Sequence, residues 1–398
     1  MAACTSGRGS GGASGPDQTT STAPAATAAQ SETPSGENGT TPSTDVDSPV
    51  YRPTDPLPDG PMGEILASEP VGAPAGAAAW RVLYRSQNAA GRPIGVSGLV
   101  IRPGGRAPAG GWPVVSWAHG TTGSADKCAP SKQGADTVDG LNSLLRLGYV
   151  VAATDYEGLG TPGPHPYLVG ASEGRSVLDA ARAARALIPE ATGGVSVWGH
   201  SQGGQAALWA GELAAGYAPD LAVSGVVAFA PAARFRSFLA DTSTPLLAGF
   251  EVAAAAGLAA SHPELKLSDV LNADALARVG VLETACIAEV VVTFAVLAGG
   301  ALVPGGIDRP EWQAAVVANE AGAHRSVPPV LVLQGQDDTL VRPGVADQYQ
   351  QAACASGSSV EVRRYAGADH GGVLSAGRSD ALSWTADRLA RKPVGKAC

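Results

Sequence analysis

The sequence predicts an α/β fold in which a mainly parallel sheet is covered by helices on both faces. Short, continuous apolar runs alternate with helical segments along most of the 398 residues, a pattern typical of strands buried on both faces. A Gly-x-Ser-x-Gly turn at Gly199–Gly203 joins a β-branched run to an apolar helical segment. One long stretch, 232–326, interrupts the alternation because it lacks strand signals.

The first half of the sheet begins with two strands, 79–86 and 94–101, which a turn at 88–93 joins into an antiparallel hairpin. Further along the chain, strands are expected at 113–118 and 149–154, separated by a helix at 138–147. A helix at 172–187 follows, with Ser172 as its expected N-cap.

The second half continues the alternation. A strand that starts at Val195 enters the serine turn, and a helix follows at 205–213. Later strands are expected at 223–230, 329–334 and 360–365, and a closing helix at 378–391. These segments place the core of the fold in residues 58–231 and 327–398.

The stretch 232–326 is predicted to form a helical cap inserted into this core. Its apolar segments are 246–260, 271–277 and 285–302, and Glu289 interrupts the last. A membrane span needs about 20 mostly uncharged apolar residues, so no transmembrane segment is expected. We expect the cap to cover the carboxyl edge of the sheet and face a hydrophobic substrate; the alternative is a second small core.

The N-terminal residues 1–57 are rich in Ser, Thr, Gly and Pro and are predicted to be a disordered tether. Cys4, in Met1–Gly7, resembles the lipidated cysteine at the end of a bacterial lipoprotein signal, although the hydrophobic part of a signal peptide does not precede it. This predicts a secreted or envelope-anchored lipoprotein. The alternative is an incidental N-terminal cysteine.

Charge and cysteine content exclude several classes of function. The net charge is −9 and the chain has no basic run, so we expect no binding to nucleic acid or to anionic membrane surfaces. Cysteines stand at 4, 128, 286, 354 and 398, without metal-type spacing. The four in the folded part can pair in an oxidising, exported setting, which would leave Cys4 over; the alternative is free buried thiols.

A glycine pattern at Gly158–Gly163 matches the dinucleotide fingerprint but is rejected as one. That site requires a helix to begin at the glycines, whereas Pro162, Pro164 and Pro166 prevent a helix here. We therefore expect no cofactor, and an ordered loop near the active site instead.

Ser201 is the candidate nucleophile. It stands at the centre of the Gly-x-Ser-x-Gly turn between strand and helix, the context in which this motif exposes a reactive serine. Gly199 and Gly203 lack the side chains that would clash in so tight a turn.

An acid and a base follow in the required order. The strand ending at Gly335 leads to Asp337 and Asp338; the usual distance from the strand-ending glycine favours Asp338, with Asp337 as the alternative. His370 is the one histidine beyond this acid. The order Ser201, Asp338, His370 is that of the α/β-hydrolases, in which the histidine is the general base and the acid orients it.

Stabilisation of a tetrahedral intermediate requires two backbone amides directed at its oxygen. One is expected from Gln202, directly after the nucleophile. The other is expected from the loop that follows strand 113–118, at Thr121, with Thr122 as the alternative.

Several segments together resemble the secretory lipase family, from about residue 60 to the C-terminus: Ala118–Gly123, Asp155–Leu168, Gly199–Gly204 and Gln334–Asp338. The resemblance implies an α/β-hydrolase with a large helical lid after the strand that follows the nucleophile helix. It also implies two disulfides, which correspond here to Cys128–Cys286 and Cys354–Cys398.

The expected function is that of a monomeric serine hydrolase that cleaves carboxylic esters, acylglycerols above all, through an acyl-enzyme. An acyltransferase or a polyester depolymerase with the same three residues is the alternative enzyme. An inactive surface-binding protein is the alternative from another class.

Overall fold

The computed structural model describes residues 48–239, 245–297, 299–395 and 397–398. Cys4 and most of the predicted tether lie outside these residues. Within the predicted tether, the 3₁₀ helix Pro49–Tyr51 has Val50 and Tyr51 buried against Leu83 of the core. Residues 49–51 therefore pack on the folded core, because two apolar side chains here are covered by the sheet.

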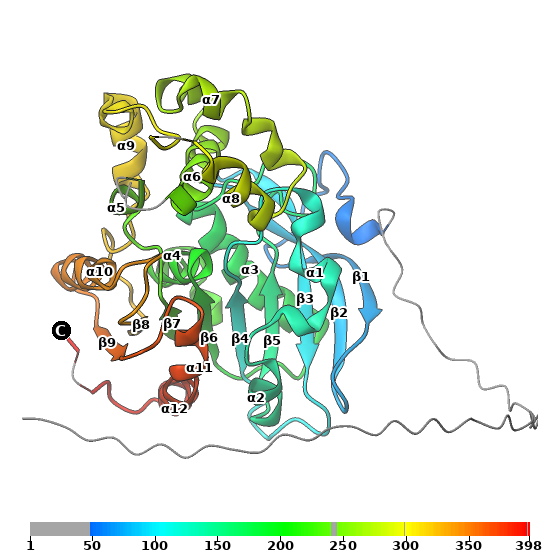
Figure 1. The fold of residues 1–398 in the computed structure, drawn as a ribbon. Coiled ribbons are helices and arrows are strands. Elements are labelled where there is room, and N and C mark those ends of the chain that lie inside the picture. Colours follow the sequence, from blue (N-terminus) through cyan, green and yellow to red (C-terminus); the bar gives the residue numbers. More distant parts are fainter. Residues whose placement is uncertain (1–47, 240–244, 298, 396) are drawn as a thin grey trace, which may run out of the picture. The chain divides into compact units, whose positions relative to one another are not determined.

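A nine-stranded sheet forms the centre, in the order β1-β2-β3-β5-β4-β6-β7-β8-β9 (Figure 1). The pairs β1–β2, β2–β3 and β3–β5 are antiparallel, and the other pairs are parallel. The strands are β1 (Ile65–Val71), β2 (Ala78–Gln87), β3 (Pro93–Arg102), β4 (Val114–Ala118), β5 (Val150–Thr154), β6 (Val195–His200), β7 (Val223–Phe229), β8 (Val330–Gly335) and β9 (Val360–Tyr365). The predicted α/β fold is confirmed. The patterns missed β1, a partly exposed edge strand that contains Pro70.

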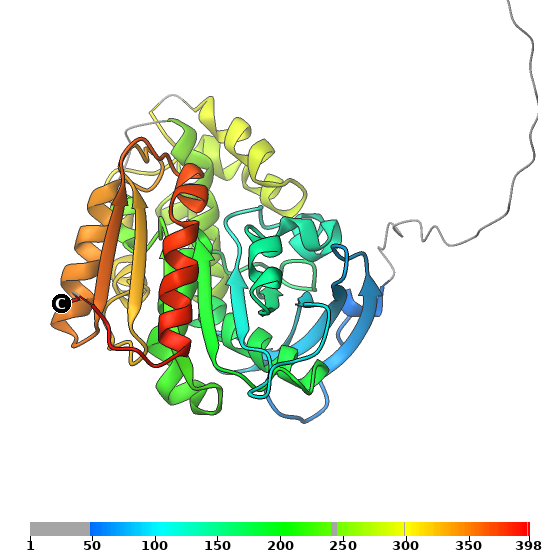
Figure 2. The same ribbon diagram turned by 90° about the horizontal axis from the view of Figure 1, so that it is seen from below.

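Helices cover both faces of the sheet (Figures 1 and 2). Alternate residues of each central strand enter two separate apolar cores: in β4, for example, Val114 packs with the helices of one face and Val115 with those of the other. The first face carries α3 (Gly170–Leu187), α4 (Gln202–Tyr217) and α10 (Pro343–Ala355), and the second carries α2 (Leu141–Arg146), α11 (Gly372–Ala376) and α12 (Arg378–Leu389). Burial on both faces explains the continuous apolar runs of these strands.

The starts of α3 and α2 differ from the predictions for identifiable reasons. The helix α3 begins at Gly170, and Ser172 is therefore not its N-cap; its hydroxyl lies in the first turn and donates to the Glu157 carboxylate. The helix α2 is shorter than the predicted 138–147, because Gly140 before it adopts a left-handed backbone with φ of 69°.

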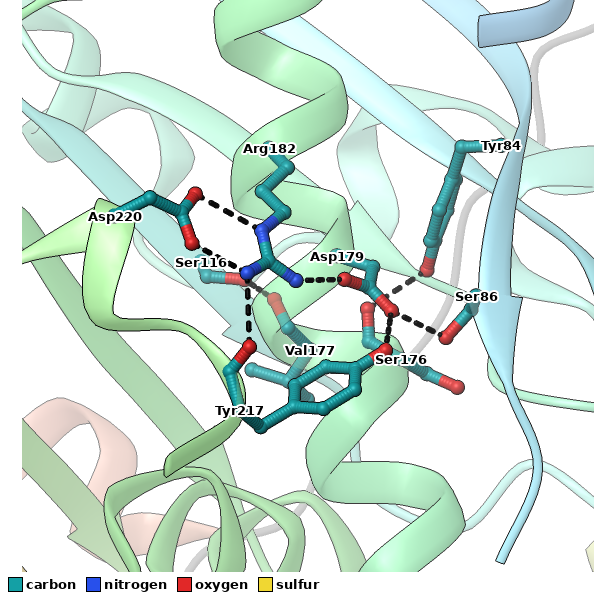
Figure 3. A network of polar contacts seen from close by, with 9 residues as sticks. All are labelled: Tyr84, Ser86, Ser116, Ser176, Val177, Asp179, Arg182, Tyr217 and Asp220. Atoms are coloured by element: carbon teal, nitrogen blue, oxygen red, sulfur yellow. Dashed lines mark hydrogen bonds and ion pairs between the residues drawn. The ribbon is translucent and has the colours of Figure 1, made fainter. Parts of the chain in front are cut away.

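A buried polar network fixes α3 in position (Figure 3). The carboxylate of Asp179 accepts hydrogen bonds from Ser86 on β2 at 2.7 Å and from Tyr217 at the end of α4 at 2.6 Å. It also pairs with Arg182 at 2.8 Å, and Arg182 reaches on to Asp220. Burial raises the pKa of Asp179, and these three partners oppose the rise. The network thus joins three elements through one carboxylate.

The helices between β7 and β8 form an insertion at the carboxyl edge of the sheet (Figure 1). They are α5 (Phe235–Leu239), α6 (Ala248–Ser261), α7 (Ala273–Leu276), α8 (Ile287–Ala295) and α9 (Pro310–Ala318). These helices have an apolar core of their own, which also includes Tyr167, Leu168 and Val169 of the loop before α3. In the described part of the chain, every helix is too short or too polar to cross a membrane.

Candidate active site

Ser201 lies at a sharp turn between β6 and α4. Its backbone has φ of 58° and ψ of −116°, a strained conformation for a residue with a side chain. The two glycines of the motif permit this turn: a Cβ on Gly199 would lie 1.9 Å from the carbonyl oxygen of Gly203, and one on Gly203 would lie 2.0 Å from that of Ala118. The turn directs Ser201 away from the sheet at its carboxyl edge.

The structure brings together Ser201, His370 and Asp338. The Nε2 atom of His370 lies 2.9 Å from Ser201 Oγ, and its Nδ1 atom lies 2.8 Å from Asp338 Oδ2. Because the ionised carboxylate only accepts hydrogen bonds, Nδ1 carries the proton and Nε2 is free to accept the one from Ser201. The arrangement can therefore move a proton from the serine hydroxyl to the imidazole.

The two candidate acids have different environments. Asp338 is 3% exposed, and its Oδ1 atom accepts the amides of Leu340 and Val341 at 2.9 Å each. Its Oδ2 atom accepts hydrogen bonds from His370 Nδ1 and from the side-chain amide of Gln334. Asp337 is exposed, and its backbone amide donates to Ala368. Of these two acids, only Asp338 has a hydrogen bond to the imidazole.

His200 supports the loop that carries His370. Its Nε2 atom lies 2.8 Å from the carbonyl oxygen of His370, and the two rings are 4.7 Å apart. Burial, followed by the neighbouring His370, lowers the pKa of His200 to about 4. The neutral ring therefore donates to the His370 carbonyl. No local pattern in the sequence points to this partner.

The loop after β4 borders the nucleophile. A Cβ built on Gly120 would lie 3.7 Å from Ser201 Cβ, so the backbone on either side of Gly120 is close to the serine. The amides of Thr121 and Gln202 donate no hydrogen bond to another described residue, which leaves both available for a ligand. The Thr121 hydroxyl lies 2.8 Å from the Tyr167 hydroxyl, whereas the Thr122 carbonyl accepts the amide of Ile287 in the cap.

Two disulfides are present, and they are the pairs that the resemblance implies. Cys128–Cys286 spans 158 residues and connects the region of the loop after β4 to the start of α8. A β-bridge between Gly123 and Cys286 lies beside it. Cys354–Cys398 spans 44 residues and holds the C-terminus to α10.

The rejected glycine motif forms a loop that reaches the site. Its surroundings contain His165, for which the sequence indicated no role. The Nδ1 atom of His165 donates to the Glu157 carbonyl at 2.8 Å, and its Nε2 atom lies 3.0 Å from the side-chain nitrogen of Gln202. Among the described residues, no group of three His, Cys, Asp or Glu is placed to hold a metal ion.

The sequence is similar to those of proteins described as lipases. Residues 131–397 match the family described as secretory lipase. The chain is 27% identical to lipase A of Moesziomyces aphidis over 360 residues, covering 81% of this chain and 76% of that protein. It is also 27% identical over 375 residues to a protein of Mycobacterium tuberculosis named a probable inactive lipase, covering 87% and 83% of the two chains.

Two solved structures share the fold. Candida antarctica lipase A in its closed state superposes with a TM-score of 0.76 at 20% identity, covering 88% of both chains. The rice cell wall degrading esterase LipA from Xanthomonas oryzae gives a TM-score of 0.69 at 19% identity, covering 83% of this chain and 99% of the esterase.

Proposed function

The chain belongs to the secretory lipase family, and we propose that it is an active serine hydrolase that cleaves the carboxylic esters of lipids, acylglycerols above all. One observation carries the proposal: Ser201, His370 and Asp338 form a continuous chain of hydrogen bonds at 2.9 and 2.8 Å. One relative is named a probable inactive lipase, so family membership alone leaves activity open. The geometry of these three side chains favours activity here.

In the proposed reaction, Ser201 Oγ attacks the ester carbonyl carbon while its proton passes to Nε2 of His370. The carbonyl oxygen becomes negative and accepts hydrogen bonds from the backbone amides of Thr121 and Gln202. The intermediate collapses as the imidazolium gives its proton to the departing alcohol, which leaves an acyl-enzyme. Water then attacks the acyl carbon while His370 takes its proton. The bond between the acyl carbon and Oγ breaks, His370 returns the proton to Ser201 Oγ, and the carboxylic acid leaves. Asp338 holds the imidazole in the required tautomer throughout.

A cavity of about 470 Å³ lies between the cap and the loops near the site, and Ser201, Asp338 and His370 do not line it. This volume is within the usual range of small-molecule sites. The cap contributes apolar walls to it, and His165, which contacts the side chain of Gln202, also lines it. Its apolar side chains include Ala125, Ala256, Leu267, Val279 and Leu282.

The test is turnover of p-nitrophenyl esters of increasing chain length and of a triglyceride, below and above its solubility limit. We expect Ser201→Ala to abolish turnover. Ser383→Ala, which removes an exposed hydroxyl on α12, is the matched control and should retain it. Turnover that persists in Ser201→Ala would remove Ser201 from the mechanism. Acyl transfer to an added alcohol in preference to water would indicate an acyltransferase.

Export is part of the proposal, since the family is described as secretory and two disulfides are present. We also propose that Cys4 is lipidated in the exported protein. Processing of the precursor in the producing cell should then be sensitive to globomycin, and a Cys4→Ser precursor should not be processed at this site. Insensitivity of the wild-type precursor would contradict the anchor.

A further inference from the structure

The loop that contains His165 and Tyr167 makes side-chain hydrogen bonds to both residues that would supply the oxyanion amides, Thr121 and Gln202. The Tyr167 hydroxyl lies 2.8 Å from the Thr121 hydroxyl. Two residues earlier in the chain, the His165 ring accepts a hydrogen bond from the side-chain amide of Gln202 at 3.0 Å. The position of this loop therefore bears on both amides at once.

A fully buried carboxyl group, that of Glu173 in the first turn of α3, fixes this arrangement. Its Oε1 atom accepts the side-chain amide of Gln202 at 2.7 Å and the backbone amide of Leu168 at 2.9 Å. The Gln202 amide thus donates one proton to His165 and the other to Glu173. Both protons are used, so the side chain next to the nucleophile has one orientation.

Leu168 shows why such a support is needed. Its φ of 59° is unusual for a residue with a branched side chain. Its backbone amide donates a hydrogen bond to Glu173. Its carbonyl oxygen accepts hydrogen bonds from the side-chain amides of Gln205, at 3.1 Å, and Asn319. A strained backbone persists only where its surroundings fix it in this way. Loss of the Glu173 acceptor would release strain directly into the loop.

The surroundings of Glu173 favour its uncharged form. Its Oε2 atom makes no hydrogen bond to another described residue. Among the described residues, Tyr156 and Tyr167 lie close enough to interact with its charge, and His165 shares its partner Gln202. None of the three is a cation at neutral pH, since burial lowers the pKa of His165 to about 4. Burial raises the pKa of Glu173 to about 8, against the opposing effect of its two hydrogen bonds.

We propose that Glu173 is a positioning residue whose uncharged carboxyl holds Gln202 and the His165–Leu168 loop in place, and whose ionisation disables ester hydrolysis. The inference rests on the proposed function. Ionised Glu173 would place an uncompensated negative charge one side chain away from the amide that receives the oxyanion. Charge repulsion at a buried site is weakly screened, so it would oppose the transition state more than the ground state.

The sign of the pH dependence follows. Below about pH 8 Glu173 holds its proton and the site is intact, and as the pH rises through about 8 the carboxyl ionises. We expect kcat of the wild-type protein on a soluble p-nitrophenyl ester to fall on this alkaline side, with KM little changed. Glu173→Gln keeps the shape and the acceptor oxygen but cannot ionise. Its kcat at pH 7 should stay within roughly threefold of wild type, and its alkaline decline should disappear.

Glu173→Ala removes the acceptor itself. Loss of one oxyanion donor costs on the order of a hundredfold in rate, so misplacement of Gln202 should lower kcat by at least about tenfold at pH 7. If this variant does not fold, the Gln variant still decides the question. The matched control is Glu212→Gln, since Glu212 is another largely buried carboxyl, on α4, whose pKa burial raises to about 7. Its side chain binds Gly322 and His324, so the variant should keep the wild-type alkaline decline.

An alkaline decline that persists unchanged in Glu173→Gln, with turnover intact, would overturn the inference alone. A wild-type protein that turns over no ester would overturn the proposed function and the inference with it. A second readout requires no turnover. The infrared difference spectrum between wild type and Glu173→Gln at pH 7 should contain the carbonyl band of a protonated carboxyl, which should vanish as the pH passes about 8. Absence of this band at pH 7 would overturn the inference whatever the activity.

Discussion

Removal of the Cys128–Cys286 disulfide should damage both stability and catalysis. The bond closes a loop of 158 residues. In the chain-entropy relation this loop restricts the unfolded state by about 5 kcal/mol. The double variant Cys128→Ala/Cys286→Ala should lose a free energy of unfolding of this order, measured by urea denaturation at pH 7 with tryptophan fluorescence as the signal.

The catalytic effect follows from what else the bond holds. Beside it, Gly123 forms a β-bridge with Cys286, and the Ile287 amide donates to the Thr122 carbonyl at 2.9 Å. Thr121, the proposed oxyanion residue, is the next residue toward the N-terminus. Without the disulfide the loop can move relative to the cap, so we expect kcat to fall by roughly tenfold to a hundredfold.

The second disulfide supplies the control. Cys354–Cys398 closes a loop of 44 residues, worth about 4 kcal/mol in the same relation. It lies between α10 and the C-terminus, away from the oxyanion loop. Cys354→Ala/Cys398→Ala should therefore lose similar stability and keep its kcat. A loss below about 1 kcal/mol in the first double variant, or an equal loss of kcat in both, would refute the reasoning.

Three further predictions concern buried carboxyl groups. Asp338→Asn should lower kcat by on the order of 10⁴-fold, since the amide favours the wrong imidazole tautomer. Asp337→Asn should keep a kcat close to that of wild type. The reverse ranking in steady-state kinetics would assign the acid to Asp337. Asp179→Ala should lower the free energy of unfolding by about 3 kcal/mol, because the hydroxyls of Ser86 and Tyr217 lose their buried acceptor. A urea midpoint equal to wild type would count against the network of Figure 3. Burial raises the pKa of Glu212 from 4.5 to about 7. The folded state therefore holds an extra proton between these values, and stability falls as the pH rises across that window. Glu212→Gln should flatten this slope in denaturation measured from pH 5 to 7, and an unchanged slope would contradict the assignment.

Much of the fold could be predicted because its central strands are buried on both faces. Such strands are mostly apolar, so β4, β5, β7 and β8 stand out as nearly continuous apolar runs. The edge strand β1 lacks this constraint, since it is only partly buried, and the patterns missed it. The start of α3 was also misplaced, because the hydroxyl of Ser172 binds the Glu157 carboxylate instead of capping the helix.

The sequence predicted a candidate nucleophile, acid and base because each follows a strand in a recognisable turn. The choice of Asp338 over Asp337 rested on distance from Gly335, and the contact of Asp338 with His370 is consistent with that choice. No local pattern pointed to Glu173. Glu173 and Gln202 are in contact although they are 29 residues apart in the sequence, and His165 and Gln202 are in contact although they are 37 residues apart.

By itself, the sequence determined the α/β architecture, and it predicted the helical insertion and the roles of Ser201, Asp338 and His370. These properties are local, since each depends on apolar periodicity or on a turn of a few residues. The tertiary structure alone decided which side chains support Ser201 and the proposed oxyanion amides: His200 beneath His370, and Glu173 with His165 around Gln202. The physical reason is that such support depends on burial and on contacts between distant segments, which exist only once the sheet, α3 and α4 have packed together.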